Sequence, residues 1–75
     1  MKSYSSREVI RMLLDDGWYL DEATGSHHQF KHPVKQGKVT VPHPRRHLQV
    51  KTLLSILRQS GLKGRNPEEG GEGNG

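Results

Sequence analysis

Apolar residues near the start of the chain recur at helical spacing, three or four positions apart, which is typical of one face of an amphipathic helix. These positions are Val9, Ile10, Leu13 and Leu14. Ser5 and Glu8 fit a capping box, in which each side chain bonds the main-chain N–H of the other. Gly17 follows the run and suits the left-handed conformation that often ends a helix. The pattern predicts a first helix over residues 5–16.

A second apolar run at helical spacing lies in the later part of the chain. Its positions are Val50, Leu53, Leu54 and Leu57. Gly61 follows this run as Gly17 follows the first. We therefore predict a second helix with these residues on its buried face, ending at Gly61.

Short segments with β preference separate the two runs. Residues 18–20 (Trp-Tyr-Leu), 27–32 and 39–41 (Val-Thr-Val) each fit a strand. Pro33 and Pro42 end the second and third strands, since proline cannot donate a ladder hydrogen bond. The order helix, three strands, helix predicts an α+β two-layer sandwich, α-β-β-β-α, in which two helices cover one face of an antiparallel sheet. The other face should remain open to solvent.

Alternation along the second strand assigns its side chains to the two faces. Phe30 is its one strongly apolar residue and should face the helices, so His28 and His32 should be half-buried beside it. The open face then receives His27, Gln29 and Lys31. Residues 23–26 form the preceding turn, in which Gly25 is free to adopt positive φ.

The charge is segregated along the 75 residues, whose formal net charge is +4. Between Glu22 and Glu68 there is no acidic residue, and all five histidines fall in that interval. Its basic residues are Lys31, Lys35, Lys38, Arg45, Arg46, Lys51, Arg58, Lys63 and Arg65. A stretch whose charges are all positive is typical of a protein that binds a polyanion, although a solvated basic surface has the same composition.

Several functional classes are disfavoured. The chain has no cysteine, so disulfides and thiolate zinc sites are excluded. No segment approaches the roughly 20 apolar residues of a membrane span, and we expect a cytoplasmic protein. The histidines lack the spacing of a structural metal site, so we expect no metal and no other cofactor. Residues 65–75, rich in glycine and glutamate, should be a disordered tail after a single domain of residues 1–64.

Four segments, in their order and spacing, resemble the HicA family of bacterial toxins. They are Asp16-Gly17-Trp18, residues 25–33 (Gly-Ser-His-His-Gln-Phe-Lys-His-Pro), residues 39–44 (Val-Thr-Val-Pro-His-Pro) and residues 57–62 (Leu-Arg-Gln-Ser-Gly-Leu). The resemblance covers about residues 5–62. It implies a fold like that of double-stranded-RNA-binding domains, an mRNA interferase that cleaves RNA and arrests translation, and an antitoxin partner of the HicB type.

The resemblance also implies a functional histidine in the Gly-Ser-His segment, which maps onto His27. The doubled histidine leaves His28 as the next candidate, and the strand alternation favours His27 because it should be exposed. A histidine can act as acid or base at cellular pH, and the RNA supplies its own 2′-hydroxyl nucleophile. We expect RNA to be held by Ser26, Gln29, Lys31, Lys38, Arg45 and Arg46. The alternatives are an RNA-binding module that does not cleave and a basic face that docks an acidic partner.

Overall fold

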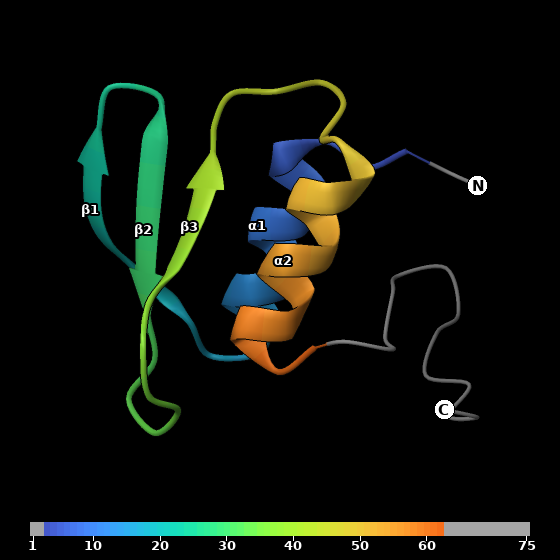
Figure 1. Cartoon of the computed structure of the whole chain (residues 1–75). Helices are drawn as coiled ribbons and strands as arrows, with labels where there is room; N and C mark the ends of the chain where they lie inside the picture. Colours follow the sequence, from blue (N-terminus) through green and yellow to red (C-terminus); the bar gives the residue numbers. More distant parts are fainter. Residues whose placement is uncertain (1–2, 63–75) are drawn as a thin grey trace, which may run out of the picture.

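The computed structural model describes residues 3–62, which form two helices and a three-stranded sheet. The elements are α1 (Ser6–Asp15), β1 (Tyr19–Thr24), β2 (His27–Lys31), β3 (Val39–Pro42) and α2 (Val50–Ser60). The sheet is antiparallel in the order β1-β2-β3, and both helices lie on the same side of it (Figure 1). The predicted α-β-β-β-α sandwich, like that of double-stranded-RNA-binding domains, is confirmed. The predicted tail and the domain boundary at residue 64 lie outside the described residues.

The predicted signals set both ends of α1. Glu8 N–H donates to Ser5 Oγ at 3.1 Å, and Ser5 N–H donates to Glu8 Oε1 at 2.9 Å, which completes the capping box. Gly17 follows the helix with φ of +104°. A Cβ at this position would lie 2.8 Å from Nε2 of His32. Glycine is therefore required here by its conformation and by the close approach of the imidazole.

The hairpin between β1 and β2 is tighter than predicted. Ala23 and Thr24, expected in a turn, belong to β1 and pair with His28 and His27. The loop is residues 25–26 alone, and Gly25 has φ of +58°, as the first position of a type II′ hairpin turn requires. An irregularity between Leu20 and Glu22 lets β1 absorb one extra residue before this turn.

The core lies between the sheet and the two helices. Its buried apolar side chains are Tyr4, Val9, Leu13, Trp18, Phe30, Val39, Val41, Leu48, Leu53, Ile56, Leu57 and Leu62. The predicted buried face of α2 is wrong at Val50 and Leu54, which are about half exposed, whereas Ile56 is buried. Leu53, Ile56 and Leu57 form the apolar stripe of α2 that packs against the sheet. The hydrophobicity of the residues alone did not distinguish this stripe from the predicted one. No helix among the described residues is long and apolar enough to cross a membrane.

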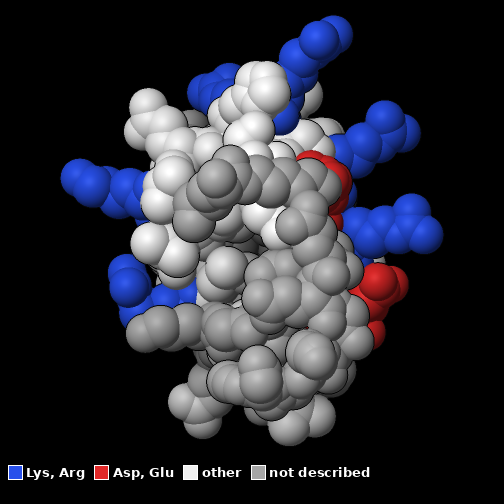
Figure 2. Space-filling view, turned by 90° about the vertical axis from the view of Figure 1, so that its right-hand side faces the viewer, with Lys and Arg blue, Asp and Glu red and all other residues white. Residues whose placement is uncertain are grey.

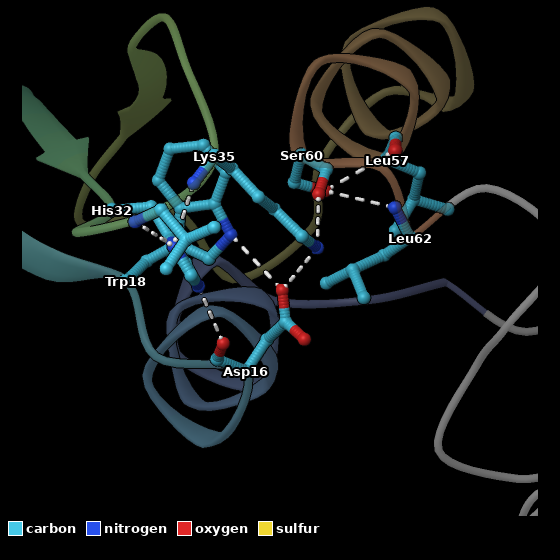
Figure 3. Close-up of polar contacts among 8 residues, drawn as sticks. Asp16, Trp18, His32, Lys35, Leu57, Ser60 and Leu62 are labelled. Atoms are coloured by element: carbon cyan, nitrogen blue, oxygen red, sulfur yellow. Dashed lines mark hydrogen bonds and ion pairs between the residues drawn. The ribbon is translucent and has the colours of Figure 1, made fainter.

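The end of α1 is joined to the rest of the fold by a polar cluster around one carboxylate, the Asp16 cluster, defined as Asp16, Trp18, His32, Lys35 and Ser60 (Figure 3). Oδ2 of Asp16 accepts from Trp18 Nε1 at 3.2 Å and from Lys35 Nζ at 2.5 Å. The same ammonium group donates to the carbonyl oxygen of Ser60 at 3.0 Å. One lysine therefore links the end of α1 to the end of α2.

His32 is held in one tautomer by this cluster. Its Nδ1 accepts from the main-chain N–H groups of Val34 and Lys35, each at 3.0 Å. Its Nε2 lies 2.8 Å from the carbonyl oxygen of Asp16, to which it must therefore donate. The ring packs edge-on against Trp18, with centroids 5.2 Å apart. These contacts confirm the predicted packing role of His32.

Replacing Asp16 with Asn should lower the free energy of unfolding at neutral pH by about 1–2 kcal/mol, because a charged hydrogen bond is lost. The hydrogen bond from Lys35 holds the pKa of Asp16 below its ordinary value of 3.8, against the opposing effect of burial. The stabilisation is therefore complete above pH 3.8 and is lost as the pH falls through the lower, folded-state pKa. Denaturant melts of both proteins as a function of pH measure the difference, which should vanish in acid. Asp15→Asn, at the exposed neighbouring carboxylate, is the control, and an equal loss there would contradict the role of the cluster.

Candidate functional site

The hairpin turn places two histidines at one end of β2. His27 pairs with Thr24 in β1 and with Pro42 in β3. Its side chain is exposed, as predicted. The structure gives its ring no hydrogen bond to any described residue, so nothing described fixes the orientation of this imidazole.

His28 occupies the opposite, helix-facing side of the sheet. It is half-buried, pairs with Val41 and shares the parity of buried Phe30, as predicted. Its Nδ1 is buried and has no hydrogen-bond partner among the described residues. The ring meets that of His43 edge to face, with centroids 4.9 Å apart and an interplanar angle of 81°. Packing therefore fixes this imidazole, and a functional role is one explanation for a buried nitrogen without a partner.

His43 is brought to His28 by two contacts from distant parts of the chain. Its main-chain N–H donates to the carbonyl oxygen of Ser26 in the hairpin turn at 2.9 Å. Its Nδ1 lies 2.6 Å from Oγ of Ser6, the first residue of α1, which is 1% exposed. We call His28, His43 and Ser6 the histidine cluster. Sequence analysis missed Ser6 and did not single out His43, because Ser6 and His43 are 37 positions apart.

The five histidines occupy different surroundings. His32 belongs to the Asp16 cluster, and Nδ1 of His47 lies 3.0 Å from Ser3 Oγ at the surface. His28 and His43 are the two histidines whose rings are in contact within the described chain. Residues 3–62 contain no group of three or more His, Cys, Asp or Glu side chains placed to hold a metal ion.

Three of the predicted RNA-binding residues lie at the same end of the molecule as the histidine cluster. Ser26 is exposed in the hairpin turn, and Arg45 and Arg46 are exposed in the loop after β3. Main-chain N–H of Arg45 donates to Ser6 Oγ at 2.9 Å, and its carbonyl oxygen accepts from the N–H of Ser6 at 2.9 Å. The loop is therefore tied to the start of α1 beside His43.

The structure separates the other predicted binding residues from this end. Lys31 ends β2, and Lys38 directly precedes Val39, the partner of Phe30, so both lie toward the far end of the sheet. Nζ of Lys31 also lies 4.0 Å from Oδ2 of Asp21, which partly compensates its charge. Gln29 lies between the two ends, opposite Thr40. The predicted set is therefore two groups rather than one patch.

Basic side chains are not confined to one edge of the face that Figure 2 shows. In the view of Figure 2, Lys and Arg side chains project from the top and from both sides, while acidic side chains gather along one edge.

The sheet with two helices on one face defines a fold of the double-stranded-RNA-binding type. The sequence matches the family model described as the HicA toxin of bacterial toxin–antitoxin systems over residues 6–62. The chain therefore belongs to the HicA toxin family, and its role is that of the toxin in a pair whose other member is an antitoxin. A comparison with curated proteins gives no match.

The two histidines of the hairpin should differ in their effect on stability. His27→Ala should cost well under about 1 kcal/mol, because an exposed ring without partners contributes little packing. His28→Ala should cost more, since it removes a half-buried ring from its contact with His43 and leaves space beneath the sheet. Thermal melts of both variants measure this. Equal melting temperatures would contradict the assignment of the two side chains to opposite faces.

Proposed function

We propose that this toxin is an mRNA interferase that cleaves RNA through proton transfer by a histidine, without a metal or other cofactor. Membership of a toxin family and the acid-free basic interval of residues 23–67 support an RNA target. The proposed antitoxin is of the HicB type and would act by covering the histidine cluster and the loop that carries Arg45 and Arg46.

The reaction needs no nucleophile from the protein. A base removes the proton of the 2′-hydroxyl, whose oxygen then forms a bond to the adjacent phosphorus. The bond from phosphorus to the 5′ oxygen breaks, and that oxygen takes up a proton, leaving a 2′,3′-cyclic phosphate and a 5′-hydroxyl. Imidazole suits these proton transfers at cellular pH. The guanidinium groups of Arg45 and Arg46 would stabilise negative charge on the phosphorane.

The choice between the two histidines depends on their surroundings. Sequence alternation favours His27 because it is exposed. The geometry favours His28, the second candidate, because a group that transfers protons must be held in place by its neighbours. The ring contact between His28 and His43 is the observation that carries this assignment, since His27 has no such partner among the described residues. We therefore propose His28 as the acid or base and assign no proton transfer to His27, which lies on the opposite, open face of the sheet.

The substitutions His28→Gln and His27→Gln test this assignment. His28→Gln should lower the rate of RNA cleavage by about 100-fold or more and abolish growth arrest on expression in a bacterium. His27→Gln should keep most of the activity. Cleavage of a model mRNA by variants shown to be folded, with chelator present, is the measurement. If His27→Gln is the inactive variant, the sequence-based choice is right and the geometric one is wrong.

Substitutions should show that the two groups of basic residues contribute differently to RNA binding. Arg45→Ala with Arg46→Ala should weaken RNA binding and reduce its salt dependence, because phosphate contacts release counterions. Lys31→Ala with Lys38→Ala, the matched pair at the far end of the sheet, should have the smaller effect, because Lys31 already faces Asp21. Binding of a model mRNA at several salt concentrations measures both. Affinity indifferent to salt would remove the electrostatic basis of the proposal.

The alternative is an RNA-binding module of the same fold that does not cleave. The basic interval supports it as well as it supports the enzyme. Salt-dependent RNA binding by the wild-type protein without any cleavage product would establish this alternative.

A further inference from the structure

We propose that His43 is a second proton-transfer residue of this site and that the buried hydroxyl of Ser6 holds it in both of its protonation states. The proposal rests on the proposed function, because it concerns the same cleavage reaction. Cleavage needs one group to take the proton of the 2′-hydroxyl and another to give a proton to the leaving oxygen. His28 would perform one of these transfers and His43 the other.

The geometry places two imidazoles at one end of the sheet with their outer nitrogens available. Nδ1 of His28 is the one buried side-chain nitrogen or oxygen without a partner in residues 3–62. The structure gives no hydrogen bond to Nε2 of either His28 or His43, and neither atom is a buried one without a partner, so neither is fully enclosed by the described part of the chain. With ring centroids 4.9 Å apart, both Nε2 atoms can serve the same phosphodiester group.

The contacts of Ser6 suit a histidine that changes its protonation. Oγ of Ser6 accepts from the main-chain N–H of Arg45 at 2.9 Å. The single hydroxyl proton has two acceptors within reach, Nδ1 of His43 at 2.6 Å and the carbonyl oxygen of Arg45 at 3.3 Å. Because Nε2 is the atom that gains or loses the proton in the reaction, Nδ1 keeps its own proton in both states and donates it to Oγ. The hydroxyl then donates to the carbonyl oxygen of Arg45.

His32 shows what a purely structural histidine looks like in the same fold. Two main-chain N–H groups point at its Nδ1 and a carbonyl oxygen faces its Nε2, so only the neutral form protonated on Nε2 satisfies all its partners. His43 has one partner that both donates and accepts, and one nitrogen free of described partners. The imidazole of His28 contacts the ring of His43, and the main chain of Arg45 bonds to the same Ser6 hydroxyl. The ion pairs found within residues 3–62 do not include His43.

Two histidines complete the proton balance of the cleavage. One Nε2 takes the proton of the 2′-hydroxyl as its oxygen bonds to phosphorus, and the other donates a proton to the 5′ oxygen as the phosphorus–oxygen bond breaks. The two rings end the reaction with their protonation exchanged, and proton exchange with water restores them. No further reactant is needed.

The decisive variant is His43→Asn, whose amide can keep the hydrogen bond to Ser6 but cannot transfer a proton. Wild-type cleavage of a model mRNA, followed as a function of pH under single-turnover conditions, should give a two-limbed profile. His43→Asn should lower the rate by about 100-fold or more and remove one limb, with RNA affinity unchanged. His47→Asn is the matched control, because that imidazole is also bonded to a serine hydroxyl and lies at the surface.

Nuclear magnetic resonance of the imidazole nitrogens gives a test that does not depend on cleavage. In the neutral imidazole of His43 the proton should sit on Nδ1, where it is donated to Ser6, whereas His32 should carry its proton on Nε2. A neutral His43 protonated on Nε2 instead would overturn the proposal.

The outcomes distinguish this inference from the proposed function. If wild-type protein does not cleave RNA, the proposed function itself fails. If wild-type protein cleaves, His28→Gln does not, and folded His43→Asn keeps both limbs of the profile, only the role of His43 fails. A lower melting temperature of His43→Asn with an unchanged profile shape would make His43 a packing residue and would also overturn the proposal.

Discussion

The ion pair between Asp16 and Lys35 joins the ends of both helices beside the sheet. An acidic residue at the carboxyl end of a helix is unfavourable beside the helix dipole, and α1 has no basic residue in its last turn. Lys35 supplies the missing positive charge from the loop after β2 and also binds the end of α2. One carboxylate therefore connects the end of α1, the start of the sheet at Trp18 and, through Lys35, the end of α2 (Figure 3). It does so in a small domain that has no disulfide to close its chain.

The Asp16 cluster lies at one end of the sheet, and the candidate chemistry lies at the other. β2 runs from the histidine cluster toward the Asp16 cluster, and His28 and His32 share one parity along this segment. Their surroundings make them different: His32 has a hydrogen-bond partner on each ring nitrogen, whereas Nδ1 of His28 has none among the described residues and its ring instead contacts His43. A structural histidine, His32, is therefore fixed at one end of this segment, and the candidate reactive histidine, His28, lies at the other end.

The site is assembled from three separate segments. The tight turn at Gly25 sets the register of β2, the N–H of His43 bonds to the turn at Ser26, and Ser6 at the start of α1 receives both His43 and Arg45. The capping box that begins α1 therefore has a second consequence, because it fixes the backbone that carries Ser6. Helix formation and the geometry of the site are coupled at this residue.

Periodicity, caps and turn residues in the sequence determined the two helices, the three strands and their order, because these signals act over a few positions. They also determined that His27 is exposed and that His28 faces the helices, since the period of a strand is two. They could not determine which stripe of α2 is buried, because Val50, Leu54 and Ile56 are equally apolar and only the sheet selects among them. Nor could they bring His43 to Ser6, or separate Lys31 and Lys38 from Arg45 and Arg46. Those relations join positions far apart in the chain, and only the packing of α1, the hairpin and the loop after β3 against one another decides them.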